Sequence, residues 1–172
     1  MQQYAMIFGT YMGIFWILKF ALIPLGLTHP FMSLLFICLT ICVPFMGYYY
    51  TRLYRDKVCG GVITFMHAWS FNILMYMCAA LLTAIAHYVY FQYIDGGYIL
   101  DTCRDTLQTL MNTPGMEANT EQIEQALDTM AGLTPVDIML NMLQTNVFFC
   151  VLVGIPTALL AMRSRPKENL QN

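Results

Sequence analysis

Charged residues are scarce in this chain of 172 residues. Only 10% of the residues are charged, whereas soluble domains carry about 25%. The eight Lys and Arg residues form no more than two small clusters, which excludes the extended basic face of a nucleic-acid-binding protein. Because 58% of the residues are hydrophobic, the composition predicts one integral membrane domain over residues 1–172.

Motifs of catalysis and metal binding are missing as well. The sequence has no H-E-x-x-H, no G-x-S-x-G and no phosphate-binding loop. Its six cysteines include no C-x-x-C pair, and His67 and His87 stand about 30 Å apart if both lie on one helix. The sequence therefore predicts no metal site and no cofactor, and it favours a non-catalytic protein over an enzyme.

Four long apolar stretches predict a four-transmembrane-helix bundle, because a membrane span needs about 20 mainly apolar residues. Residues 62–94 give the clearest signal, since they contain no charged residue, no Pro and no Gly. The predicted fold class is all-α. The four spans are expected at residues 4–26, 31–50, 62–94 and 136–162.

Prolines and a capping motif predict where these helices bend and begin. Pro24 is expected to kink or end the outer portion of the first span, because proline removes a backbone hydrogen bond and crowds the preceding turn. Pro44 and Pro156 are expected to bend the second and fourth spans for the same reason. Thr134 and Asp137 have the spacing of a capping box, which predicts the start of the fourth span.

A different pattern fills residues 95–135, which hold most of the acidic residues. Apolar residues repeat at helical spacing over residues 103–111 and again over residues 123–131. Turn-forming residues 112–115 separate the two runs, and Asn119 resembles the start of the second helix. This pattern predicts a small amphipathic helical hairpin that caps the bundle on the outer side of the membrane.

Basic residues indicate orientation, because Lys and Arg concentrate on the cytoplasmic side of membrane proteins. One cluster follows the second span and the other follows the fourth. The clusters are Arg52, Arg55 and Lys57, and Arg163, Arg165 and Lys167. Four spans then place both termini in the cytoplasm and residues 95–135 outside.

Several short segments resemble an uncharacterised family of bacterial four-helix inner-membrane proteins, classed as a domain of unknown function. The matching segments are YAM at 4–6, GTYMG at 9–13, GYYY at 47–50, YRDK at 54–57, GGVITFMHAW at 60–69 and YIDGGY at 93–98. The resemblance implies a multi-pass protein of the cell inner membrane, with residues 95–135 in the periplasm. It supplies no activity, but it implies an association with polyprenyl-phosphate glycosyltransferases and hence with lipid-linked sugars.

Polar residues inside the spans are the candidates for function, because ionisable groups within a membrane are costly. Lys19 is the one positively charged residue inside a predicted span. In the third span, polar residues at helical spacing lie on one face together with small residues. In the fourth span, the polar residues lie on one face with one another. The predicted ligand-binding set is Lys19, Thr83, His87, Asp137, Asn141, Gln144 and Thr145.

The same residues have a structural interpretation. Polar side chains commonly join helices within a bundle, and Lys19 would then pair with Asp137 or reach towards the interface. Gly9 and Gly13 form a G-x-x-x-G motif that lets another helix approach closely.

The sequence supports two main hypotheses for function. The first is a non-catalytic accessory or scaffold subunit of a membrane assembly, linked to the handling of lipid-linked sugars. The alternative is a small lipid or solute carrier that uses a polar cavity around Lys19. A membrane enzyme ranks last, because no acid–base pair or nucleophile arrangement is present. The expected partners are membrane lipid and either another protein or a second copy within the membrane.

Overall fold

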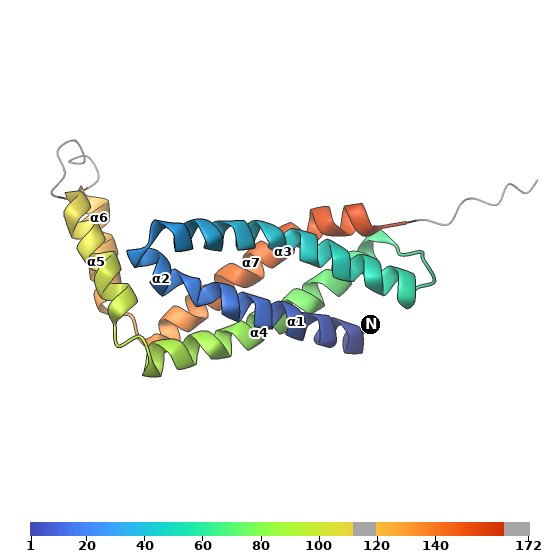
Figure 1. Cartoon of the computed structure of the whole chain (residues 1–172), viewed down its shortest axis with the longest axis horizontal. Coiled ribbons are helices and arrows are strands. Elements are labelled where there is room, and N and C mark those ends of the chain that lie inside the picture. Colours follow the sequence, from blue (N-terminus) through green and yellow to red (C-terminus); the bar gives the residue numbers. More distant parts are fainter. Residues whose placement is uncertain (112–119, 164–172) are drawn as a thin grey trace, which may run out of the picture.

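The computed structural model describes residues 1–111 and 120–163, and most of that part of the chain is helical. The helices are α1 (Gln2–Phe20), α2 (Leu22–Thr28), α3 (Pro30–Lys57), α4 (Phe65–Tyr93), α5 (Tyr98–Met111), α6 (Thr120–Ala131) and α7 (Pro135–Ala161) (Figure 1). The predicted all-α class is confirmed. The expected turn at residues 112–115, the helix start at Asn119, and the basic residues Arg165 and Lys167 lie outside the described residues.

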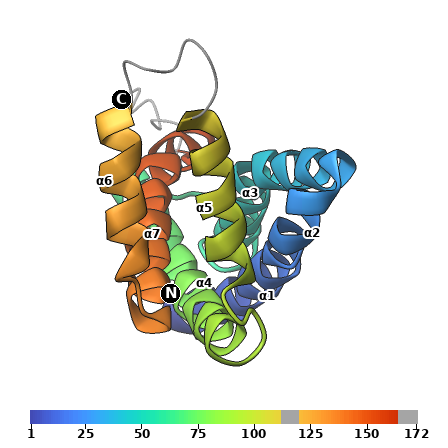
Figure 2. The same cartoon turned by 90° about the vertical axis from the view of Figure 1, so that its left-hand side faces the viewer.

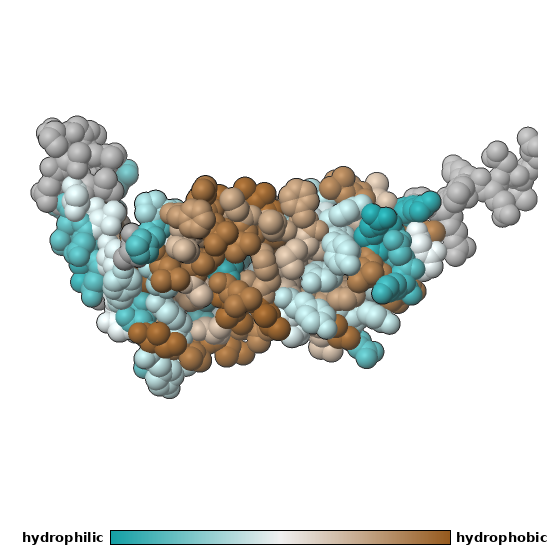
Figure 3. Space-filling model, in the orientation of Figure 1, coloured by the Kyte–Doolittle hydropathy of each residue, from teal (hydrophilic) through white to brown (hydrophobic). Residues whose placement is uncertain are grey.

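Four segments are each long and apolar enough to cross a membrane, which confirms the number and order of the predicted candidate spans. They are Gln2–Leu27, Pro30–Lys57, Phe65–Tyr93 and Pro135–Ala161. Figure 3 shows the same property on the surface, where a hydrophobic belt lies between more hydrophilic ends.

The second of these helices is longer than the sequence indicates. It was expected to end at residue 50, but α3 continues to Lys57. Arg52 stabilises this extension because its Nε lies 3.6 Å from the carboxylate of Asp56, one turn further on. The helix ends just before Gly60 and Gly61, whose φ angles of +65° and +83° are readily adopted only by glycine.

Local sequence signals explain the other helix ends. The first span breaks between α1 and α2 at Ala21. Pro24 accounts for this break, because its ring lacks the N–H that would bond to the carbonyl of Phe20. At the start of α7, the Thr134 hydroxyl accepts from the backbone N–H of Asp137, and the Asp137 carboxylate accepts from the N–H of Thr134. The predicted capping box is therefore confirmed.

The long helices are arranged around α4, which packs against α1 on one side and α7 on the other (Figure 1). The α3 helix packs mainly against α2 and α7, and it contacts α1 and α4 much less. Most of the α3 surface is therefore outside the core. This uneven packing leaves room between α3 and the other three long helices.

Two glycines allow α1 to approach α4 closely. A Cβ atom at Gly9 would lie 2.6 Å from the carbonyl oxygen of Met75, and one at Gly13 would lie 2.9 Å from Cδ2 of Leu82. Such separations are shorter than van der Waals contact. The close approach therefore depends on the missing side chains of this G-x-x-x-G motif.

Helices α5 and α6 pack against each other as a hairpin at the end of the bundle away from the N-terminus (Figure 1). In Figure 2, which faces that end, both helices lie in front of the ends of the long helices. The α5 helix also contacts α2. The predicted helical hairpin is thus present.

Candidate functional site

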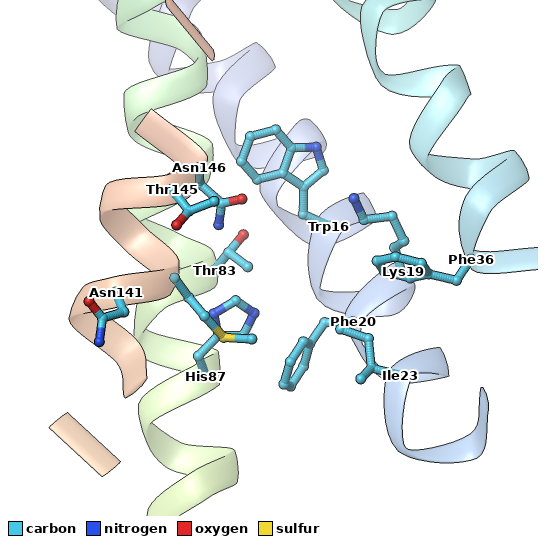
Figure 4. A pocket seen from close by; sticks show the side chains of 11 residues that line it. Trp16, Lys19, Phe20, Ile23, Phe36, Thr83, His87, Asn141, Thr145 and Asn146 are labelled. Atoms are coloured by element: carbon cyan, nitrogen blue, oxygen red, sulfur yellow. The ribbon is translucent and has the colours of Figure 1, made fainter. Parts of the chain in front are cut away.

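A cavity of about 300 Å³ lies where α1, α2, α3, α4 and α7 face one another. We call it the polar chamber, because side chains with hydrogen-bonding groups make up about half of its lining (Figure 4). These are Lys19, Thr83, His87, Asn141, Thr145 and Asn146. Apolar side chains complete the wall, and they are Trp16, Phe20, Ile23, Phe36 and Met142.

The polar chamber brings together five of the seven residues that the sequence singled out. Those five are Lys19, Thr83, His87, Asn141 and Thr145. Asp137 and Gln144 are not in its lining, and both are exposed at the outer edge of the polar stripe on α7. The ligand-binding role of the five remains a prediction, whereas Asp137 and Gln144 have no place in this chamber.

The polar chamber also includes two residues that sequence analysis missed. Asn146 comes from α7 and Trp16 from α1. Trp16 stands three residues before Lys19, so both lie on the same side of α1. Asn146 stands five residues after Asn141, a spacing outside the single-face pattern used to choose candidates on α7.

The α4 wall is formed by a polar stripe at helical spacing. Thr83 and His87 are both buried, and they continue a face that includes the buried Asn72, Tyr76 and Ala79. The Thr83 hydroxyl donates to the carbonyl of Ala79 at 2.8 Å, so its proton is engaged within α4. The His87 ring packs against Phe20, with ring centres 4.1 Å apart, while its Nδ1 has no hydrogen-bond partner.

Lys19 supplies a positive charge to this chamber. Its ammonium lies 5.1 Å from the centre of the Phe36 ring and 6.0 Å from that of Trp16, which are distances for cation–π attraction. Within residues 1–111 and 120–163, no carboxylate forms an ion pair with Lys19. Asp137, its expected partner in the structural interpretation, instead caps α7. The cation thus faces the chamber without a counter-charge.

A second cavity of about 230 Å³ adjoins the polar chamber. The two cavities share Trp16, Lys19 and Asn146. We call the second one the apolar chamber, because its remaining wall is largely apolar. That wall consists of Thr40, Val43, Pro44, Tyr76, Phe149, Cys150 and Val153. Lys19 therefore stands at the junction of a polar and an apolar space.

Three buried polar atoms on these walls lack a hydrogen-bond partner. They are Nε1 of Trp16, the hydroxyl of Tyr76 and Nδ1 of His87. These three residues are 7%, 1% and 4% exposed, respectively. Buried polar groups are almost always hydrogen-bonded in folded proteins. A fourth such atom, Nε1 of Trp69, lies outside both chambers. All three atoms are buried against other protein atoms, and the Tyr76 hydroxyl packs against Gly47 of α3.

A separate polar network joins α3, α4 and α7 elsewhere in the core. The Asn72 side chain is fully buried, its Oδ1 accepts from the Thr51 hydroxyl, and its Nδ2 donates to Thr157 at 3.1 Å. Nearby, the Arg55 guanidinium donates to the carbonyl of Ala161 at 2.9 Å. Because these side chains form hydrogen bonds with one another or with a backbone carbonyl, the network serves helix packing. Sequence analysis missed it because Thr51 and Thr157 are far apart in the chain.

These features define a class: an all-helical protein with four helices able to cross a membrane and a cation-containing chamber between them. Comparison with known families identifies the family to which the chain belongs. The chain belongs to the family described as "Protein of unknown function (DUF4199)", whose model matches residues 7–163. The expected membership of an uncharacterised family is thereby confirmed. No curated protein and no solved structure matches the chain.

Proposed function

We propose that this is an integral membrane protein that binds an amphiphile with an anionic head group in the two chambers. The observation that carries the proposal is Lys19, an uncompensated cation at the junction of the polar and apolar chambers. A charge within a membrane is costly unless something pairs with it, so its retention there favours a functional role.

Lys19 favours a ligand rich in hydrogen-bond acceptors. A lysine ammonium donates hydrogen bonds and accepts none. Lys19 lines both chambers, whereas Nε1 of Trp16 and the Tyr76 hydroxyl are buried against protein atoms. A phosphate or carboxylate at the junction would accept from the ammonium and neutralise its charge.

The positions of the chambers favour an amphiphile over a small solute. His87 precedes Tyr93, the last residue of α4, by six residues or about 9 Å, whereas Tyr76 precedes it by 17 residues or about 25 Å. The polar chamber therefore lies near the hairpin end of the bundle, and the apolar chamber reaches towards its middle. A lipid in the membrane leaflet on the hairpin side would have its head group at the depth of the polar chamber and its chain at the depth of the apolar chamber.

The distribution of charge supports a periplasmic position for the hairpin and a cytoplasmic position for both termini in a cell inner membrane. Ile63 and Arg163 pair through their backbones, so the loop that follows α3 lies beside the end of α7. Arg52, Arg55 and Arg163 thus gather at the end opposite the hairpin. Under the positive-inside rule, that end faces the cytoplasm.

The sequence-based hypothesis of a non-catalytic accessory or scaffold subunit is compatible with this function. Asn141, Thr145 and Asn146 line the polar chamber, and among the described residues their side chains have no hydrogen-bond partner. Amide and hydroxyl groups both donate and accept, so they suit a hydroxyl-bearing head group. A lipid-linked sugar combines such hydroxyls with a phosphate and an apolar chain. The subunit would then hold this lipid for a partner enzyme.

Mass spectrometry after gentle extraction tests the proposal. The protein, Lys19→Met and the matched control Lys57→Met are purified identically, and every co-purifying lipid is quantified. Lys57 is exposed at the end of α3 and lines neither chamber, so it controls for loss of a lysine. We expect an anionic lipid with the protein and the control, and at least a tenfold smaller amount with Lys19→Met.

Thermal unfolding of the three proteins in detergent separates a lost site from a lost fold. Equal lipid content in all three folded proteins would contradict the proposed function. A second protein that co-purifies in fixed ratio would support the subunit hypothesis, and its loss with Lys19→Met would show that the lipid is needed for assembly.

A further inference from the structure

A face of α7 next to the polar chamber carries an exposed amide, that of Gln144. At about 100° per residue, Gln144 points about 100° away from Thr145, on the side opposite Asn146. Its side chain is exposed and has no hydrogen-bond partner among the described residues. A shallow depression surrounds it, and α7 alone forms its lining: Asn141, Gln144, Thr145, Val147, Phe148 and Val151.

Gln144 lies too deep to reach the membrane surface if α7 crosses the bilayer. The 27 residues of α7 span about 40 Å, and the hydrocarbon layer is about 30 Å thick, so roughly 5 Å projects at each end. Gln144 is nine residues, or about 13 Å, from the first residue of α7. Its amide therefore starts roughly 8 Å inside the hydrocarbon layer, where an unpaired polar group is unfavourable.

We propose that this face of α7 packs against the same face of a second copy of the chain, with the two Gln144 side chains hydrogen-bonded across a two-fold axis. A carboxamide both donates and accepts, so it complements its own copy in a symmetric contact. Side chains of this type join helices within membranes. Phe148 and Val151, one and two turns further along α7, supply apolar contact beside the amide.

The symmetric contact also covers an edge of the polar chamber. Asn141 and Thr145 line both the chamber and the outer depression, so they form the rim between the two. A second copy on the outer face would shield this rim from lipid. Lys19 does not line the outer depression, so loss of lipid binding through Lys19→Met leaves the dimer contact in place.

Energy transfer between two labelled populations of the protein tests the dimer. Donor-labelled and acceptor-labelled copies are mixed in phosphatidylcholine–phosphatidylglycerol vesicles over a range of protein-to-lipid ratios. Gln144→Leu removes the amide, and Gln144→Asn retains it. Gln92→Leu is the matched control, because Gln92 is also exposed but lies near the end of α4.

We expect the unmodified protein and Gln92→Leu to associate equally, Gln144→Asn to retain most of the association, and Gln144→Leu to associate roughly tenfold more weakly. Three outcomes would overturn the proposal: an unmodified protein that stays monomeric, undiminished association of Gln144→Leu, or cross-linking of this face in native membranes to a different protein. The Gln144→Asn result keeps the test valid if Gln144→Leu folds poorly.

Discussion

The ammonium of Lys19 on α1 lies 5.1 Å from the ring centre of Phe36 on α3, and this contact joins the two helices across the polar chamber. Attraction to an aromatic ring contributes about 0.5–2 kcal/mol. That is less than the cost of about 2.5–3.5 kcal/mol for placing a lysine near the centre of a membrane helix. The aromatic contact therefore reduces the cost of Lys19 without removing it.

This balance predicts that Lys19→Met stabilises the protein when no ligand is bound. Methionine fills a similar volume without the charge, so we expect the free energy of unfolding to rise by about 1–2 kcal/mol. Thermal or denaturant unfolding of lipid-stripped protein measures it, with Lys57→Met as the control for general loss of charge. A lower stability of Lys19→Met would show that Lys19 serves packing and would argue against a binding role.

The Tyr76 hydroxyl leads to a second prediction. It is buried without a hydrogen-bond partner, so Tyr76→Phe removes an unsatisfied group and should leave the stability unchanged or raise it by up to about 1 kcal/mol. Tyr54→Phe is the matched comparison, because the Tyr54 hydroxyl lies 3.2 Å from Nε2 of His67. That change should cost about 1 kcal/mol.

Asn72 gives a third prediction, about the network that joins α3, α4 and α7. Asn72→Ala leaves the hydroxyls of Thr51 and Thr157 without their side-chain partner, and we expect a loss of about 1–3 kcal/mol. Asn141→Ala is the control, because Asn141 is exposed and has no hydrogen-bond partner among the described residues. Its effect should stay within about 0.5 kcal/mol in the same unfolding assay. Equal effects of the two changes would mean that the network adds nothing to stability.

The parts of this structure that could be predicted from sequence depend on local signals. Long apolar runs identify the candidate spans, and the capping box at Thr134 identifies the start of α7. These signals suffice because the length and the start of a helix depend mainly on neighbouring residues. The end of α3 at Lys57 was harder to predict, because charged residues can continue a helix beyond its apolar part.

The rotation of α7 about its own axis could not be predicted from the sequence. Asp137 and Gln144 share one broad stripe with Asn141 and Thr145, yet only the latter two line the polar chamber. The rotation of α7 about its axis decides which edge of the stripe faces inward. Packing of the buried Gly154, Ala158 and Ala161 sets that rotation, and Gly154 lies against Trp69 of α4. Such contacts between distant segments are not encoded in a local pattern.

Gly9 gives the last prediction, which tests the close approach of α1 to α4. Gly9→Ala places a methyl group 2.6 Å from the carbonyl oxygen of Met75 and 2.7 Å from Cβ of Cys78, so one of the two helices must move. Alanine favours a helix by about 1 kcal/mol over glycine, but overpacking costs about 1–3 kcal/mol.

We therefore expect Gly9→Ala to lower the free energy of unfolding by up to about 2 kcal/mol, net of that gain in helix propensity. Gly132→Ala is the control, because a Cβ atom there meets no other atom within 4 Å. Unfolding in detergent, followed by circular dichroism, compares the two. Because α1 also positions Trp16 and Lys19, a displaced α1 should reduce lipid retention as well. If Gly9→Ala matched Gly132→Ala in both measurements, the tight α1–α4 contact would not be needed for the fold or the chambers.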